Sequence, residues 1–202
     1  RDLRAWVGQL HGDGATRVTV SPGWGRVDTH LAQLAAEDGV DLLVVGTHQR
    51  AGVARLWQGS VSRGVLHAGY GNVASVPRSG CEAEVDGIAT FRRILVPTDF
   101  SPLANRAVPV AYGMASAGGV VHLLHVVTRK PGEDDDDPGG RLRALVPRGA
   151  IARGIATEIE VVRETDAGVA ISHASARLGV DAVCMATHGR SGVSRIVLGS
   201  QA

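Results

Sequence analysis

The stretch "ATHGRSGVSRIVLGS" occupies Ala186–Ser200, and a near-copy, "GTHQRAGVARLWQGS", occupies Gly46–Ser60. When both are extended to begin at Gly179 and Gly39, they keep a constant offset of 140 residues, and 11 of 22 positions are identical. Weaker matches continue backwards in the same order, as "LRALV" with "LRAWV" and "ATEIEV" with "ATRVTV". Agreement at several separated points indicates two copies of one structural unit.

In the second copy, segments that predict strands alternate with segments that predict helices. The stretch "RRILVPTDFS" (Arg92–Ser101) is an apolar run followed by a turn, and Ser101 is the expected cap of the next helix. The further predicted elements are a helix from Ser101 to about Ala117 ended by Gly118 and Gly119, strands at 120–127, 155–163 and 181–186, and helices at 141–153 and 167–178. Strands alternating with helices predict a parallel, doubly wound sheet.

The first copy contains a later portion of the same unit. Its predicted elements are strands at 17–20, 41–46 and 72–76 and helices at 28–37 and 60–68. The predicted fold class is therefore α/β, with tandem Rossmann-like or flavodoxin-like, doubly wound, parallel five-stranded sheets, each incomplete in this chain. The predicted domains are the C-terminal part of a first domain at 1–77, a linker at 78–90, and a second domain at 91–202 that lacks its last helix and strand. Because Arg1 stands within a predicted helix, we expect a fragment at both ends.

Composition and charge exclude several classes of partner. The chain has 21 Lys and Arg against 20 Asp and Glu, a net charge of +1, which gives no reason to expect binding to nucleic acid or to an anionic membrane. No apolar run approaches the roughly 20 residues of a membrane-spanning helix. Cys81 and Cys184 lie in unlike contexts, so neither a disulfide framework nor a zinc site is indicated. A cytoplasmic location is the expectation.

Both glycine-containing stretches directly follow a predicted strand, which puts them at the carboxyl edge of a parallel sheet, where ligands bind. Gly189 permits a tight turn or the close approach of a ligand to the backbone. Gly199 and Ser200 would open the next helix, whose free N–H groups favour an anion such as phosphate. The alternative is a strand–helix connection that binds nothing. Neither G-x-G-x-x-G nor Gly-Lys-Ser/Thr is present, which argues against a dinucleotide site or a P-loop ATPase.

The combination of "ILVPTDFS", "HLLHVV" and G-x2-G-x9-G-[ST] after the fourth strand resembles the universal stress protein family, here in tandem. The resemblance covers nearly the whole chain. It implies a five-stranded α/β fold whose units pair through their last strands, either within a tandem chain or as a homodimer. It also implies an adenine nucleotide as the ligand of some members, ATP with or without Mg²⁺.

The resemblance assigns site residues in the second unit. Asp99, after Pro97 and Thr98, matches the position for the ribose and adenine end, and Val126 would present its backbone to the adenine. The phosphate end would be formed by the glycine stretch, namely Ala186 at the place of the pattern's first glycine, His188, Gly189, Arg190, Gly199 and Ser200.

The first unit departs from the pattern. It keeps Gly46, Gly59 and Ser60, but Gln49 stands where the middle glycine falls. If that position needs positive φ or contacts a ligand, a glutamine obstructs it. We therefore expect a degenerate first site and a competent second one.

Other residues receive structural roles. His122 and His125 lie in a predicted strand without carboxylate or cysteine partners at ligand spacing, and Cys184 is expected to be buried and inert. No residue set has the spacing of a catalytic centre, so the chain is not expected to be an enzyme. The expected function is that of a nucleotide-binding sensor or regulator in a stress response. The alternatives are a partner-binding scaffold without nucleotide and a weak ATPase.

Overall fold

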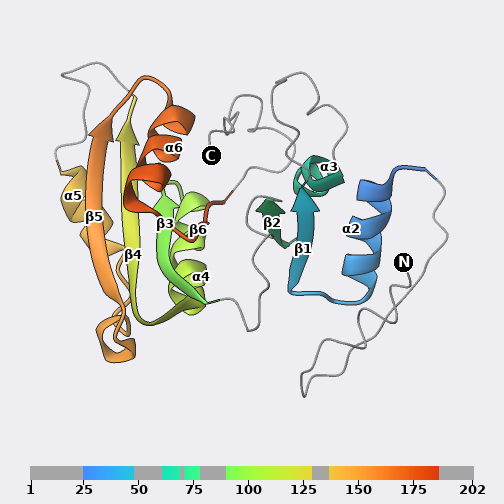
Figure 1. The fold of residues 1–202 in the computed structure, drawn as a ribbon, viewed down its shortest axis with the longest axis horizontal. Coiled ribbons are helices and arrows are strands. Elements are labelled where there is room, and N and C mark those ends of the chain that lie inside the picture. Colours follow the sequence, from blue (N-terminus) through green and yellow to red (C-terminus); the bar gives the residue numbers. More distant parts are fainter. Residues whose placement is uncertain (1–24, 48–60, 69–70, 78–89, 129–136, 187–202) are drawn as a thin grey trace.

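The structure is a computed structural model that describes residues 25–47, 61–68, 71–77, 90–128 and 137–186 (Figure 1). In residues 1–77, here called the first unit, the elements are α2 (Val27–Glu37), β1 (Leu42–Thr47), α3 (Val61–His67) and β2 (Asn72–Pro77). Strands β1 and β2 pair in parallel, from Leu42 opposite Asn72 to Thr47 opposite Pro77. The strand predicted at 17–20 lies outside the described residues.

In the described part of residues 91–202, here called the second unit, four parallel strands form a sheet. The elements are β3 (Phe91–Pro97), the 3-10 turn η3 (Ala104–Arg106), α4 (Ala107–Met114), β4 (Ala115–Val127), α5 (Pro138–Ala144), the 3-10 turn η4 (Ile151–Arg153), β5 (Ala156–Arg163), α6 (Ala167–Leu178) and β6 (Ala182–Val183). The strand order is β5-β4-β3-β6. The predicted α/β class, with parallel sheets that are incomplete in this chain, is confirmed. The predicted boundaries at 77–91 stay a prediction, because residues 78–89 are not described.

Helices cover both faces of this sheet, and the alternation of side chains along the strands divides the core in two. Ile94 and Val96 of β3 join Val121 and Leu123 of β4 in a cluster with α4 and α5. Leu95 and Leu124, the residues that point the other way, join a cluster with Ile171 and Ala174 of α6. A strand buried on both faces reads as a continuous apolar run, which is why "ILV" shows no alternation.

The boundary between α4 and β4 differs from the prediction. The helix ends at Met114, three residues before the predicted end, and Ala115 already has the extended values φ −63° and ψ 132°. Gly118 has φ 76° and its N–H donates to the Gly154 carbonyl at 2.9 Å, within β4. The register of β4 against β3 shifts between Phe91 and Arg93. The two glycines therefore shape an irregularity in a strand rather than ending a helix.

Two further predicted elements are shortened. The helix predicted at 141–153 is replaced by α5 and η4, since Pro147 lies between them and interrupts a helix. The strand predicted at 181–186 is confined to β6, so Cys184 lies just beyond a strand and is half-buried. Burial raises the pKa of the Cys184 thiol, which supports the expectation of an inert cysteine.

Gly119 is a position where a larger residue is expected to destabilise the fold. A Cβ there would lie 2.8 Å from the backbone oxygens of both Arg92 and Ser116. Gly119→Ala is therefore expected to lower the free energy of unfolding by about 1–3 kcal/mol, the usual cost of overpacking. Gly113→Ala in α4 is the control, because no described atom lies within 4 Å of a Cβ there. Urea unfolding of both variants checks this, and equal midpoints would contradict the predicted clash.

In the first unit, α2 and α3 approach closely at Gly64. A Cβ at Gly64 would lie 1.6 Å from a carboxylate oxygen of Asp28, so this contact requires glycine. Asp28 is buried and accepts hydrogen bonds from the Arg26 guanidinium, from Nε at 3.1 Å and from the terminal nitrogen at 2.6 Å. These bonds lower the pKa of the Asp28 carboxyl. No helix in the described part of the chain is long and apolar enough to cross a membrane.

Candidate functional site

The strand order locates a reversal of the winding in the four-stranded sheet. Counted along the second unit, β5-β4-β3-β6 is the order third, second, first, fourth, so the winding reverses between β3 and β6. The crossovers through α4 and α5 lie on one face and the crossover through α6 lies on the other (Figure 1). Ligands of doubly wound sheets bind at such a reversal, beyond the carboxyl ends of the strands. The residues that follow β3, β4 and β6 are therefore the candidate site.

Thr98 shapes the turn that follows β3. Its side chain is buried, its N–H donates to the Leu124 carbonyl at 2.9 Å, and its hydroxyl donates to Asn105 Oδ1 at 2.8 Å. The same hydroxyl accepts the Phe100 N–H at 3.0 Å. Pro97 is buried as well. Of the predicted Pro97-Thr98-Asp99 set, the first two thus position the turn, and their side chains are turned into the protein.

Asp99 is the exposed member of this set. Its Oδ1 accepts the N–H of Ser101 at 2.9 Å, which closes a local turn and holds the carboxylate at the edge of the sheet. Ser101 was predicted to cap a helix that begins directly after it, but α4 begins only at Ala107, and the Ser101 hydroxyl instead accepts the Ala104 N–H at 3.1 Å at the start of the 3-10 turn η3. An exposed carboxylate can accept hydrogen bonds from the hydroxyls of a sugar.

Val126 has backbone groups at the same edge of the sheet. The Leu124 carbonyl points toward β3, where it meets Thr98. Backbone groups of alternate residues in a strand point to the same side, so the N–H and C=O of Val126 are also directed toward β3. In the register of the sheet, β3 ends at Pro97 opposite Leu124. The backbone of Val126 therefore faces the space beyond the end of β3.

Three residues near this turn were not predicted as site residues. The His125 ring nitrogen Nδ1 donates to the Thr98 carbonyl at 2.9 Å, because a carbonyl can only accept. The His125 and Phe100 ring centroids are 4.3 Å apart, and the Arg141 guanidinium carbon lies 4.0 Å from the Phe100 centroid. The structural role expected of His125 is therefore to contact the Thr98 carbonyl and the Phe100 ring. No spacing rule connects Arg141 with this turn, so sequence reasoning had no signal for it.

The phosphate end of the predicted site falls mostly outside the described residues. This applies to His188, Gly189, Arg190, Gly199 and Ser200 in the second unit and to Gln49, Gly59 and Ser60 in the first. Ala186, half-buried, is the last described residue before the second glycine stretch. Gly46 is described at the end of β1, exposed, with no described atom within 4 Å of a Cβ placed on it.

A hollow of about 370 Å³ lies at the opposite end of the sheet. It is lined by Thr90, Arg92, Arg93, Gly118, Val120 and Asp181, which belong to the amino ends of β3, β4 and β6. The Asp181 carboxylate already accepts the N–H groups of Arg92 and Arg93, at 2.7 and 2.8 Å. We do not assign this hollow to a nucleotide. The Asp181 carboxylate in it already links the start of β6 to β3, and ligands of doubly wound sheets bind at the opposite, carboxyl edge.

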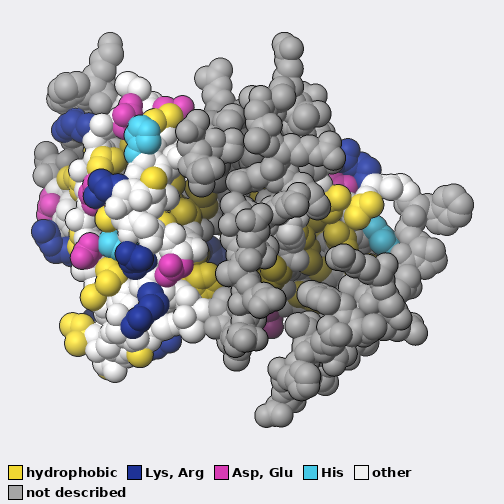
Figure 2. Space-filling view, in the orientation of Figure 1, with side chains coloured by type: hydrophobic (Ala, Val, Ile, Leu, Met, Phe, Trp, Pro, Cys, Tyr) yellow, Lys and Arg dark blue, Asp and Glu magenta, His cyan; other side chains and the backbone are white. Residues whose placement is uncertain are grey.

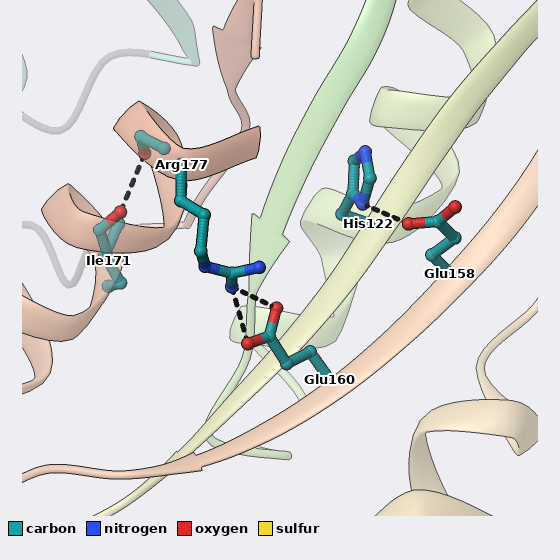
Figure 3. A network of polar contacts seen from close by, with 6 residues as sticks. His122, Glu158, Glu160, Ile171 and Arg177 are labelled. Carbon is teal, nitrogen blue, oxygen red and sulfur yellow. Dashed lines mark hydrogen bonds and ion pairs between the residues drawn. The ribbon is translucent and has the colours of Figure 1, made fainter. Parts of the chain in front are cut away.

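Two pairs of polar side chains lie on the α6 face of the sheet (Figure 3). Arg177 of α6 donates to both Glu160 oxygens at 2.6 Å, and His122 Nδ1 lies 3.1 Å from a Glu158 oxygen. His122 is buried, which agrees with its predicted structural role. Within the described residues, no group of three or more His, Cys, Asp and Glu side chains could hold a metal ion.

On the surface seen in Figure 2, basic and acidic side chains are interspersed over the described residues of the second unit. The strand order, with helices on both faces, defines a doubly wound α/β protein whose winding reverses between β3 and β6. The family model of the universal stress protein family matches residues 3–76 and 90–202. The chain belongs to the universal stress protein family.

The solved structure of one family member agrees with this fold, and two further solved structures are similar to shorter parts of the chain. A universal stress protein from Archaeoglobus fulgidus DSM 4304 has 23% identity and a TM-score of 0.58, over 84% of this chain and 58% of that one. The hypothetical protein MJ0577 has 20% identity and a TM-score of 0.44, over 52% of this chain and 81% of that one. A universal stress family protein from Burkholderia pseudomallei has 23% identity and a TM-score of 0.36, over 50% and 86%. The search of curated proteins returned no match. The chain thus spans 58% of the length of the Archaeoglobus protein.

Proposed function

We propose that this universal stress protein binds an adenine nucleotide, ATP, at the carboxyl edge of the second-unit sheet and acts as a sensor or regulator rather than as a catalyst. The observation that carries the proposal is the pairing of an exposed carboxylate, Asp99, with the outward backbone of Val126 at the winding reversal. The carboxylate suits ribose hydroxyls and the backbone edge suits an adenine ring.

The described residues fit the sugar and base end of a nucleotide. The phosphates are assigned to Gly189, Gly199 and Ser200, with His188 and Arg190 beside them, on sequence grounds. Backbone N–H groups at a helix N-terminus stabilise phosphate oxygens. Any Mg²⁺ would arrive with the phosphates, since the described residues contain no metal-binding cluster. The proposal also includes pairing of the two units, or of two chains, and a cytoplasmic location.

ATP titrated into the full chain in a calorimeter is expected to bind, and Asp99→Asn is expected to weaken it about tenfold or more. The asparagine oxygen can still accept the Ser101 N–H, so the variant keeps the turn while removing the charge. A hydrogen bond to a charged group contributes about 1.5–3 kcal/mol, which corresponds to that factor. Asp41→Asn is the matched control, because Asp41 is an exposed aspartate ahead of β1.

The absence of heat at near-millimolar ATP would reject nucleotide binding and favour a partner-binding scaffold. The same samples also address hydrolysis, for which phosphate release is followed over hours. We expect none above background. Steady release that disappears in the Asp99→Asn variant would instead make the protein a slow ATPase.

A further inference from the structure

Phe100 has an unusual backbone conformation directly after Asp99. Its φ is 64°, and among the described residues it is the one non-glycine residue with positive φ. An aromatic residue adopts this conformation at a cost, which the surrounding contacts must offset. Such residues persist where the structure holds them in place, and they concentrate at functional sites.

Three elements hold Phe100, and two of them, β4 and α5, are distant from it in sequence. His125 of β4 lies against its ring, with the two rings inclined by 32°, and Arg141 of α5 lies over the ring at 4.0 Å. From η3, Asn105 Nδ2 donates to the Phe100 carbonyl at 3.3 Å. His125 also bonds to the Thr98 carbonyl, so one side chain contacts both neighbours of Asp99. We call His125, Phe100 and Arg141 the Phe100 clamp.

Resting on the proposed nucleotide site, we infer that the Phe100 clamp is a positioning device that fixes the turn presenting Asp99 to the ribose. The ring of Phe100 is already in contact with two protein side chains. It therefore supports the turn and does not stack on the adenine. Arg141 acts through Phe100 and is not a ligand of the phosphates. Its removal loosens the sugar and base end of the site.

This assignment predicts that lysine cannot replace Arg141. A guanidinium is planar and stacks on an aromatic face, whereas the compact, strongly hydrated ammonium of lysine does so less well. A phosphate ligand would behave differently, because lysine is itself a good point charge for phosphate. Arg141→Lys therefore separates a stacking role from an ionic one without removing a charge.

The test compares Arg141→Lys with Arg143→Lys in the full chain. Arg143 is exposed on the same helix. Without nucleotide, the backbone amide NMR signals of residues 98–101 are expected to shift in Arg141→Lys and not in Arg143→Lys. In titrations with nucleotide, the affinities for ATP and for adenosine are expected to fall by the same factor, about tenfold, in Arg141→Lys and to stay unchanged in Arg143→Lys. In a Phe100→Leu background, Arg141→Lys is expected to have no further effect.

Loss of ATP affinity with adenosine affinity unchanged would overturn the inference and make Arg141 a phosphate ligand. Unchanged amide signals would overturn it as well. An equal loss in the Phe100→Leu background would show that Arg141 does not act through the ring. Failure of the wild-type chain to bind either ligand rejects the proposed function and the clamp's role in it. The amide signals then still decide whether the clamp fixes the turn at Asp99.

Discussion

Gly189→Val is expected to weaken ATP binding by at least about a hundredfold, whereas Gly46→Val leaves binding unchanged. A valine at position 189 carries a branched Cβ, which disfavours positive φ and prevents the close approach of a phosphate to the backbone. Two lost hydrogen bonds to a charged ligand, at about 1.5–3 kcal/mol each, account for a factor of this size. Calorimetry with ATP measures both variants against the wild type.

Gly46 is the control because it is the counterpart of the second-unit Ala186 in the duplicated stretch. It lies in β1, exposed, with no described atom within 4 Å of a Cβ, so valine fits the strand there. The first unit also carries Gln49 in place of the middle glycine. Thermal unfolding of both variants establishes that folding is retained. An equal loss of ATP affinity in Gly46→Val would show that the competent site has been assigned to the wrong unit.

Ile94→Ala is expected to lower the free energy of unfolding by about 2–5 kcal/mol, the largest stability change of the substitutions considered. Ile94 lies in the middle of β3, opposite Val121 of β4, and its side chain is fully buried in the cluster with α4 and α5. Truncation removes apolar burial and leaves a cavity that close-packed neighbours fill only in part.

Ile151→Ala is the matched control, with the same side chain deleted at a position that is 87% exposed. Its effect on the free energy of unfolding is expected to stay within about 0.5 kcal/mol. Chemical denaturation of the three proteins gives the comparison. If both variants unfolded at the same denaturant concentration, the sheet described for the second unit would not form its core around Ile94.

The sequence predicted the ends of an element correctly where residues next to that element set them. The helix predicted at 167–178 is α6, residue for residue. Asp166 Oδ1 accepts the N–H groups of Gly168 and Val169 at its start, and Gly179 ends it with φ 56°. Both are local effects of a capping carboxylate and of a residue without a Cβ. Gly118 looks like the same end signal, but its N–H bonds to Gly154, a partner that no local window includes.

The candidate site likewise has a part that the sequence indicated and a part that it did not. Asp99 and Val126 were assigned from the resemblance of their motifs to the universal stress protein family, and their roles stay predictions. Their setting could not be predicted. Thr98 turns inward to Asn105, and Phe100 is held by side chains from β4 and α5.

By itself, the sequence determined the duplication, the parallel α/β class, the family and the positions of the turn at Asp99 and of the glycine stretches. These depend on periodicity, caps and motifs, which act within a few residues. The tertiary structure alone decided the strand order with its reversal between β3 and β6, the irregularity at Gly118 and the contact of Arg141 with Phe100. Each of these joins residues far apart in the chain, and such pairings depend on how the helices pack on the sheet.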